Sequence, residues 1–225
     1  RVTSPPTPWQ VAEARRHDLW LVGPPPDVGS GRSIGPSHDR VLAWDLGSGL
    51  RAEQLDSIRS LAHAVRRADE QNARPLIATA DEHLRSYSRI ASVMVMRRPT
   101  LNTTFELADY PHWFRGRGQF LRPGTPAWAV IQTQPPATLL QQSAAARMQV
   151  PAIVDPQQMR LLTYAALSAG ARGLFFESRE RLDGGDAQSL QRAQALELIN
   201  SELELIEPWL AVSGLVLLYY LRFWL

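Results

Sequence analysis

The chain has 225 residues, of which 44% are hydrophobic and 20% charged, which is enough for one large domain with a buried core. Its 24 basic side chains are all arginine and lie scattered among 22 acidic ones, so the net charge of +2 comes without the basic stripe that nucleic-acid binding needs. The absence of cysteine excludes disulfides and thiolate metal sites, and it leaves the cellular compartment open.

Six short apolar runs, most of them ended by glycine, proline or charged residues, predict six β-strands. In chain order the strands are Asp18–Val22, the first four residues of Val41–Leu50, Arg74–Ala80, Ile90–Met96, Ala127–Thr133 and Leu174–Ser178. The second strand is expected to stop at a turn bracketed by Gly47 and Gly49.

Amphipathic spacing and helix-end signals predict five helices beside these strands. They are Trp9–His17, Arg51–Gln71, Thr104–Phe114, Gln157–Ala169 and Asp186–Glu207. Asp155 and Pro156 mark the start of the fourth helix as N-cap and first helical residue. Arg115–Gly118 is expected to form a turn, and Pro208 to end the last helix.

Strands that alternate with helices and consist of uninterrupted apolar runs indicate an α/β fold with a parallel sheet covered by helices. A doubly wound sheet would carry a glycine-rich phosphate turn after an early strand, and the sequence has no G-x-G-x-x-G or Walker pattern. The sequence therefore favours a (β/α)8 barrel of the TIM type, incomplete because the chain holds about six β/α units.

Four segments carry a family resemblance. Leu-Trp-Leu-Val-Gly-Pro-Pro-Pro starts at Leu19, Val-Leu-Ala-Trp-Asp-Leu-Gly starts at Val41, and Ala-Trp-Ala-Val-Ile-Gln-Thr-Gln starts at Ala127. In the fourth, a helix followed by the turn Gly170–Gly173 leads into an aromatic strand. These segments resemble the third to eighth strands of the retaining glycoside hydrolase barrels, the clan that includes β-galactosidases and cellulases. The resemblance covers Trp9–Trp209 and implies that two strands lie upstream of Arg1, which would leave two sheet edges open.

Hydrolysis by such a barrel needs two carboxyl groups, one that protonates the leaving oxygen and one that attacks the sugar. The resemblance implies a proton donor at the end of a Trp-x-x-Gly-Asn-Glu sequence, where this chain has Ser48 and Gly49 in the last two positions. It implies a nucleophile at the end of the seventh strand, where this chain offers Gln132 and Gln134. A carboxamide cannot act as a general acid and is a poor nucleophile, so both expected catalytic positions lack a carboxylate.

Among the other acidic residues, Glu177 is the best catalytic candidate, because carboxylates at strand ends face the active site of a barrel. An ion pair with Arg172, Arg179 or Arg181 is the simpler role for its side chain.

The remaining acids have structural roles as their first interpretation. Asp81, beside Glu82, is expected to cap a turn, and Asp183 and Asp186 are expected in a turn and at a helix start. The five histidines are scattered without ligand spacing. Neither a metal nor a cofactor is therefore expected.

The candidate sugar-binding residues are Trp44, Asp45, Ser48, Arg97, Trp128, Gln132 and Gln134. An exposed indole can stack on a sugar ring, although core packing is the ordinary role of a tryptophan within a strand. Trp44 and Asp45 are neighbours in one strand, so only one of them can face the barrel interior. Arg97, together with Arg98, could bind an anionic sugar or remain solvated.

The end of the chain differs in composition from the rest. Residues 1–208 are expected to form the barrel-type domain, whereas 209–225 are strongly apolar around Arg222. This segment is shorter than the about 20 apolar residues that span a bilayer, so a membrane helix is not expected. A strand such as Gly214–Tyr220, starting an appended β-domain, and a terminus that covers an open sheet edge are the alternatives. Either the apolar end or the open edges would promote self-association.

These observations favour a glycoside-hydrolase-like domain that has lost its catalytic pair and binds carbohydrate or a protein partner at the rim of strand ends. The alternative is an active glycosidase that hydrolyses O-glycosidic bonds with relocated carboxylates, with Glu177 in one role. A scaffolding protein, which would bind no glycan, is the third hypothesis.

Overall fold

The computed structural model describes residues 2–28, 33–100, 103–147 and 154–212. Six strands lie next to one another in their sequence order, from β1 (Leu21–Gly23) to β6 (Leu174–Glu177), with helices in the connections. This sequential order is that of an α/β barrel, whereas a doubly wound sheet reverses its order partway. The fold is therefore the predicted one, an incomplete (β/α)8-type barrel with six β units in the described part of the chain.

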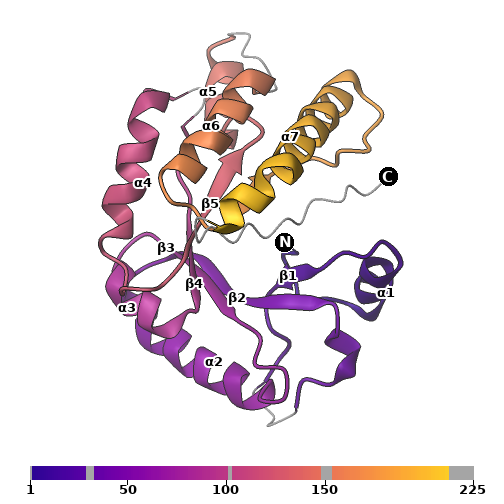
Figure 1. Ribbon diagram of the computed structural model, residues 1–225, viewed down its shortest axis with the longest axis vertical. Helices are drawn as coiled ribbons and strands as arrows, with labels where there is room; N and C mark the ends of the chain where they lie inside the picture. Colours follow the sequence, from indigo (N-terminus) through magenta and orange to yellow (C-terminus); the bar gives the residue numbers. More distant parts are fainter. Residues whose placement is uncertain (1, 29–32, 101–102, 148–153, 213–225) are drawn as a thin grey trace. The chain divides into compact units, whose positions relative to one another are not determined.

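The chain divides into two compact units, and the first consists of Arg1–Val95 with Gln119–Pro126. Its strands pair in parallel from β1 through β2 (Val41–Leu50) and β3 (Leu76–Ala80) to β4 (Val93–Met96). Its helices are α1 (Pro8–Arg16), α2 (Leu55–Ala68) and α3 (Leu84–Ile90), with 3-10 turns at Pro36–His38 and Ala52–Gln54. All residues of β3 and β4 are buried, as in parallel strands covered on both faces, and α2 packs against β2 and α3 (Figure 1).

The second unit consists of Met96–Gly118 and Ala127–Leu225. It holds β5 (Ala127–Gln132), β6, α4 (Tyr110–Gly118), α5 (Ala137–Ala145), α6 (Pro156–Ser168) and α7 (Ala187–Val212), with a 3-10 turn at Leu107–Asp109. The two strands pair in parallel, and β5 is buried throughout. The helix α6 packs against β5 and contacts both α4 and α7 (Figure 1).

The strand β2 is longer than the sequence predicts, because it continues through its glycine segment. Gly47 has a φ of 134° and Gly49 a φ of 65°, conformations that other residues rarely adopt. The pairing with β3 shifts register on both sides of Ser48. These bulge-like irregularities carry the strand to Leu50 instead of ending it in a turn.

Four helices differ from the prediction. The helix α4 starts at Tyr110 rather than Thr104, and it runs through Arg115–Gly118, where the sequence predicts a turn. The helices α3 and α5 are absent from the prediction because their seven and nine residues are too few for helical periodicity to stand out. The helix α7 continues through Pro208, which lies near its end, where a lost backbone hydrogen bond disrupts little.

The predicted N-cap of α6 is confirmed, because the side chain of Asp155 accepts hydrogen bonds from the backbone N–H groups of Gln157 and Gln158. Trp209 lies in α7, whereas the predicted strand Gly214–Tyr220 lies outside the described residues. None of the described helices combines the length and apolarity that a bilayer crossing requires.

A buried ion pair closes the turn between α2 and β3. Asp69 and Arg74 are 2% and 8% exposed, and Arg74 Nη1 donates to Asp69 Oδ1. Trp44 Nε1 donates to Asp69 Oδ2 at 2.8 Å. The other Arg74 nitrogens donate to the backbone carbonyls of Val41 and His38. The buried charges are thus paired and hydrogen-bonded, which is what burial of an ion pair requires.

Replacing Asp69 by alanine should lower the free energy of unfolding by about 3–5 kcal/mol, because the buried Arg74 would lose its counter-charge. The exposed pair of Asp56 and Arg59 is the control, and Arg59→Ala should cost less than about 0.5 kcal/mol. Urea denaturation followed by tryptophan fluorescence measures both values. Similar costs for the two variants would contradict the role assigned to Asp69.

Trp128, the second residue of β5, packs against the turn that precedes β6. Its side chain is buried, with the ring centroid 5.3 Å from that of Phe175. A Cβ at Gly173 would lie 2.8 Å from three indole atoms, closer than packed atoms approach. The tryptophan therefore requires a glycine at position 173.

Gly173→Ala should lower the free energy of unfolding by about 1–3 kcal/mol, because the added methyl group overlaps the Trp128 indole. Gly116→Ala in α4 is the matched control, since nothing lies within 4 Å of a Cβ added there. That variant should gain up to about 1 kcal/mol, because alanine is the better helix former. Thermal unfolding followed by circular dichroism compares them, and a Gly173→Ala protein as stable as the parent would refute the close contact.

Candidate functional site

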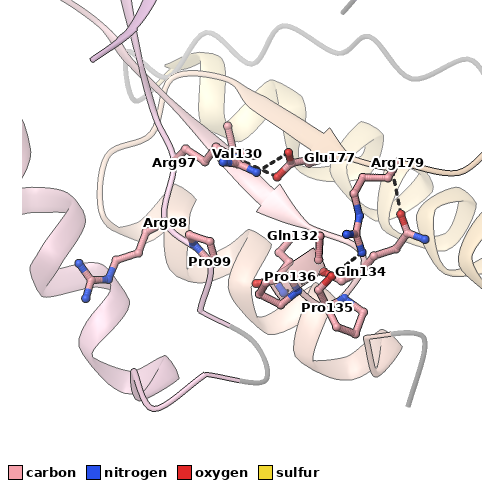
Figure 2. Close-up of a pocket in the computed structure, with 11 residues that line it drawn as sticks. Arg97, Arg98, Pro99, Val130, Gln132, Gln134, Pro135, Pro136, Glu177 and Arg179 are labelled. Atoms are coloured by element: carbon pink, nitrogen blue, oxygen red, sulfur yellow. Dashed lines mark hydrogen bonds and ion pairs between the residues drawn. The ribbon is translucent and has the colours of Figure 1, made fainter. Parts of the chain in front are cut away.

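A cavity of about 290 Å³ lies in the second unit, at the carboxyl ends of β5 and β6 (Figure 2). This edge of the sheet is where barrels of this type bind their ligands, because the loops that follow parallel strands gather there. The lining residues are Arg97, Arg98, Pro99, Val130, Gln132, Gln134, Pro135, Pro136, Ala137, Glu177 and Arg179. The cavity is close to the lower limit of the about 300–1,000 Å³ that small-molecule sites occupy.

Strand register explains why these side chains meet. The strands β5 and β6 end side by side, with Gln132 opposite Glu177. Thr133 Oγ1 donates to the backbone carbonyl of Glu177 at 2.6 Å and extends this pairing by one residue. Arg97 directly follows the end of β4 and reaches Glu177 across the cavity wall (Figure 2).

Arg97 and Glu177 form a two-point ion pair. Arg97 Nε lies 3.0 Å from Glu177 Oε2, and Nη2 lies 2.6 Å from Oε1. The sequence prediction that pairs Glu177 with Arg172, Arg179 or Arg181 is therefore corrected. The partner lies 80 residues away in the chain, and only the parallel sheet brings it near, so inspection of neighbouring arginines does not find it.

The amide groups of Gln132 and Gln134 are occupied within the protein, and both side chains are 6% exposed. Gln132 Oε1 accepts from Thr100 N at 3.0 Å, and its Nε2 donates to the carbonyl of Gln134 at 2.8 Å. Gln134 Oε1 accepts from Arg179 N at 2.8 Å, and its Nε2 donates to Glu180 Oε2 at 3.0 Å. Each amide both donates and accepts, which an ionised carboxylate in the same place could not do.

The other two arginines of the cavity differ in direction. Arg98 has its Cζ 4.2 Å from the ring centroid of Phe105 and 5.6 Å from that of Trp113, and Figure 2 shows it directed away from Glu177. Arg179 Nη2 donates to the carbonyl of Pro135 at 2.6 Å. Arg179 therefore forms part of the cavity wall, whereas Arg98 lines it only near the backbone.

Four of the predicted site residues are brought together in this cavity, namely Arg97, Gln132, Gln134 and Glu177. Trp128 is not a lining residue, because it lies four positions before Gln132, about 13 Å along the strand.

Three predicted binding residues belong to the first unit. Trp44 is fully buried in its core, and Asp45 is 7% exposed. Asp45 Oδ1 accepts from Gly47 N at 3.0 Å. Ser48 pairs in register with Thr79 of β3. Core packing is thus the observed environment of Trp44.

Arg179 and the wall Pro135–Ala137 are lining residues that sequence reasoning does not identify. The pair Pro135 and Pro136 is a sequence signal for this wall, because it directly follows a buried strand. The loops at that end of the strands form the binding site of a barrel. The helix α5, which starts at this wall, was too short to be recognised.

The acids near the start of α7 have structural roles, as predicted. Arg181 donates to Asp183 at 2.8 Å, and this hydrogen bond lowers the pKa of the Asp183 carboxyl. Asp186 Oδ1 accepts from the N–H groups of Gln188 and Ser189 at 3.0 and 2.9 Å, which makes it the N-cap. Within the described part of the chain, no three His, Asp or Glu side chains are grouped so that they could hold a metal ion.

No protein-family model matches the sequence, and no curated protein matches it. Among solved structures, the chain is similar to the β-glucuronidase from Ruminococcus gnavus in complex with D-glucuronic acid, with 12% identity and a TM-score of 0.53 over 86% of this chain and 42% of that one. A complex of β-glucuronidase from Ruminococcus gnavus with N1-substituted uronic isofagomine gives 14% identity and a TM-score of 0.41 over 71% of this chain and 32% of that one. The first likeness shows a shared fold, and the chain spans less than half of that protein's length.

Gln132→Glu should make stability depend on pH. The introduced carboxylate would face the Gln134 carbonyl, to which the amide now donates at 2.8 Å. Only the protonated carboxyl can donate there, so its pKa in the folded state should rise above the ordinary value of about 4.3. A raised folded pKa means that the variant is most stable below about pH 4 and loses stability as the pH rises towards about 7.

Chemical denaturation at about pH 4 and at about pH 7 gives the free energy of unfolding of the variant and of the parent protein at each pH. Gln141→Glu, at an exposed position of α5, is the control and should follow the parent at both. A Gln132→Glu variant with the same behaviour as the control would show that the amide is not required at position 132.

Proposed function

We propose that this chain is a carbohydrate-binding domain with a glycoside-hydrolase-like fold, and that it binds its ligand in the cavity at the ends of β5 and β6 without hydrolysing it. The observation that carries this proposal is the state of Glu177, the single carboxylate among the lining residues. Both of its oxygens accept hydrogen bonds from Arg97.

Glycoside hydrolysis requires more than one carboxylate. The two groups lie about 5–5.5 Å apart in retaining enzymes and about 6.5–9.5 Å apart in inverting ones. One of them must give a proton to the leaving oxygen. In this cavity Gln132 and Gln134 carry amides, which cannot transfer that proton. The family resemblance supports the same conclusion, since it places the proton donor at Gly49, which has no side chain.

Binding does not require a catalytic pair, and the cavity offers groups suited to a sugar. The rings of Pro99, Pro135 and Pro136 provide apolar walls, against which the C–H faces of a sugar can pack. Arg97, Arg179 and Glu177 provide charged groups for hydrogen bonds to hydroxyls. A largely apolar cavity with a few polar groups is the usual form of a small-molecule site.

The structural likeness supports carbohydrate as the class of ligand. The β-glucuronidase of similar fold was solved with a bound sugar, D-glucuronic acid. The two chains share 12% identity and this chain spans 42% of the other, so the likeness concerns the fold and not that protein's activity.

The alternative is an active glycosidase in which Glu177 serves as one of two relocated carboxylates. Its position at the end of β6 favours this role, since it lies at the edge where barrels keep their chemistry. Arg97 would then have to release Glu177 during the reaction. Turnover that is abolished by Glu177→Gln would establish this alternative in place of the binding function.

A glycan array combined with hydrolysis assays on the same glycans should show saturable binding and no turnover. Ala137→Trp should weaken the binding at least about tenfold, because an indole at this lining position fills the cavity. Ala144→Trp, at an exposed position of the same helix outside the cavity, should bind like the parent. Affinities measured by calorimetry compare the three proteins.

Two results would contradict the proposed function. Turnover of any glycan by the parent protein would remove the claim of inactivity. Equal affinities of the two tryptophan variants would place the binding site outside this cavity.

A further inference from the structure

The cavity carries an excess of positive charge. Three arginines and one glutamate are among its lining residues, and Glu177 is already neutralised by Arg97. Arg98 directs its guanidinium towards the rings of Phe105 and Trp113, so Arg97 and Arg179 are the charges that a ligand would meet.

One edge of the planar Arg97 guanidinium is available to a ligand. The group carries five N–H donors in a planar fork. Glu177 occupies Nε and one hydrogen of Nη2, and Arg97 makes no other hydrogen bond or ion pair among the residues that the structure describes. The edge formed by Nη1 and Nη2 is therefore available, and Glu177 holds the plane of the group in place.

That edge is suited to an oxyanion. Two parallel N–H groups match two oxygens of a carboxylate or a sulfate, and such charge-assisted pairs are about twice as strong as neutral hydrogen bonds. A sugar hydroxyl would accept from one N–H group of this edge and leave the other without a partner. The chemistry of Arg97 therefore favours an acidic ligand over a neutral one.

The start of α5 adds to the positive potential at the cavity wall. Pro136 is its N-cap and supplies no side-chain hydrogen bond to the first turn, and Pro135, Pro136 and Ala137 all line the cavity. The uncapped N–H groups of a helix start carry partial positive charge, which attracts anions. Arg179 lies on the same wall, where it donates to the carbonyl of Pro135.

We propose that the saccharide bound in this cavity carries an oxyanion, a carboxylate or a sulfate ester, and that the Nη1–Nη2 edge of Arg97 binds this group. Glu177 is then a positioning residue that orients Arg97. This inference rests on the proposed function, because it assigns the chemical class of the ligand in the same cavity.

The test compares three probes on the parent protein by calorimetry: a uronic acid oligosaccharide, its methyl-esterified form, and a sulfated oligosaccharide with a neutral backbone. At least one acidic probe should bind about ten- to hundredfold more tightly than the methyl ester. That preference should decrease as salt is added, because the site is partly exposed to solvent. The comparison of uronate with sulfate identifies which oxyanion is preferred.

Variants of Arg97 test whether its side chain causes the preference for acidic ligands. Arg97→Gln should remove the preference, so that this variant binds the acidic probe no more tightly than it binds the methyl ester. Arg97→Lys, which keeps the charge but not the fork, should give an intermediate affinity. Arg115→Gln, at an exposed position of α4 outside the cavity, is the matched control and should behave like the parent.

The outcomes separate this inference from the function on which it rests. Equal affinity of the parent for acidic and neutral probes would overturn the oxyanion site and leave carbohydrate binding standing. An acid preference that survives in Arg97→Gln would also overturn it. Absence of binding to every glycan, neutral or acidic, would overturn both proposals.

Discussion

The two-point ion pair between Arg97 and Glu177 determines what the cavity can do. A carboxylate whose oxygens both accept hydrogen bonds from a guanidinium is held in one place, and it holds the guanidinium in turn. The pair depends on the sheet, because Glu177 ends β6 while Arg97 follows β4. One interaction thus occupies the single acidic group among the lining residues and orients an exposed arginine of the cavity.

Buried amides complete this arrangement. Gln132 and Gln134 connect three segments that follow strands, through hydrogen bonds to Thr100, Arg179 and Glu180. Their donors and acceptors are matched to three backbone groups and to the Glu180 carboxylate, so the two amides hold the cavity wall together. A glycoside hydrolase needs reactive carboxyl groups at such positions. In this chain the same positions carry amides, which hold loops in place. Under the proposed function, the amides that stabilise these loops also account for the absence of hydrolysis.

Much of the fold could be predicted from the sequence, because buried parallel strands consist of short apolar runs and the Asp155 cap follows a local rule. Prediction failed where the determining feature was not local, and also where an element was short. The bulges of β2 depend on pairing with β3, and α5 is too short for periodicity. In the site, Gln132 and Glu177 could be identified as strand-end residues. Their partners could not, since the sheet brings Arg97 to Glu177 from 80 residues away.

The most direct test of the account is the intact mass of the protein after incubation with an activated fluoroglycoside of a sugar that it binds. In a retaining glycosidase, a carboxylate attacks the anomeric carbon and the activated leaving group departs, which leaves the glycosyl group on the enzyme as an ester. A fluorine at C2 of the sugar slows the attack of water on this ester, so the added mass persists. The account predicts saturable binding with no change in mass. A gain of one glycosyl unit, mapped to Glu177, would contradict it.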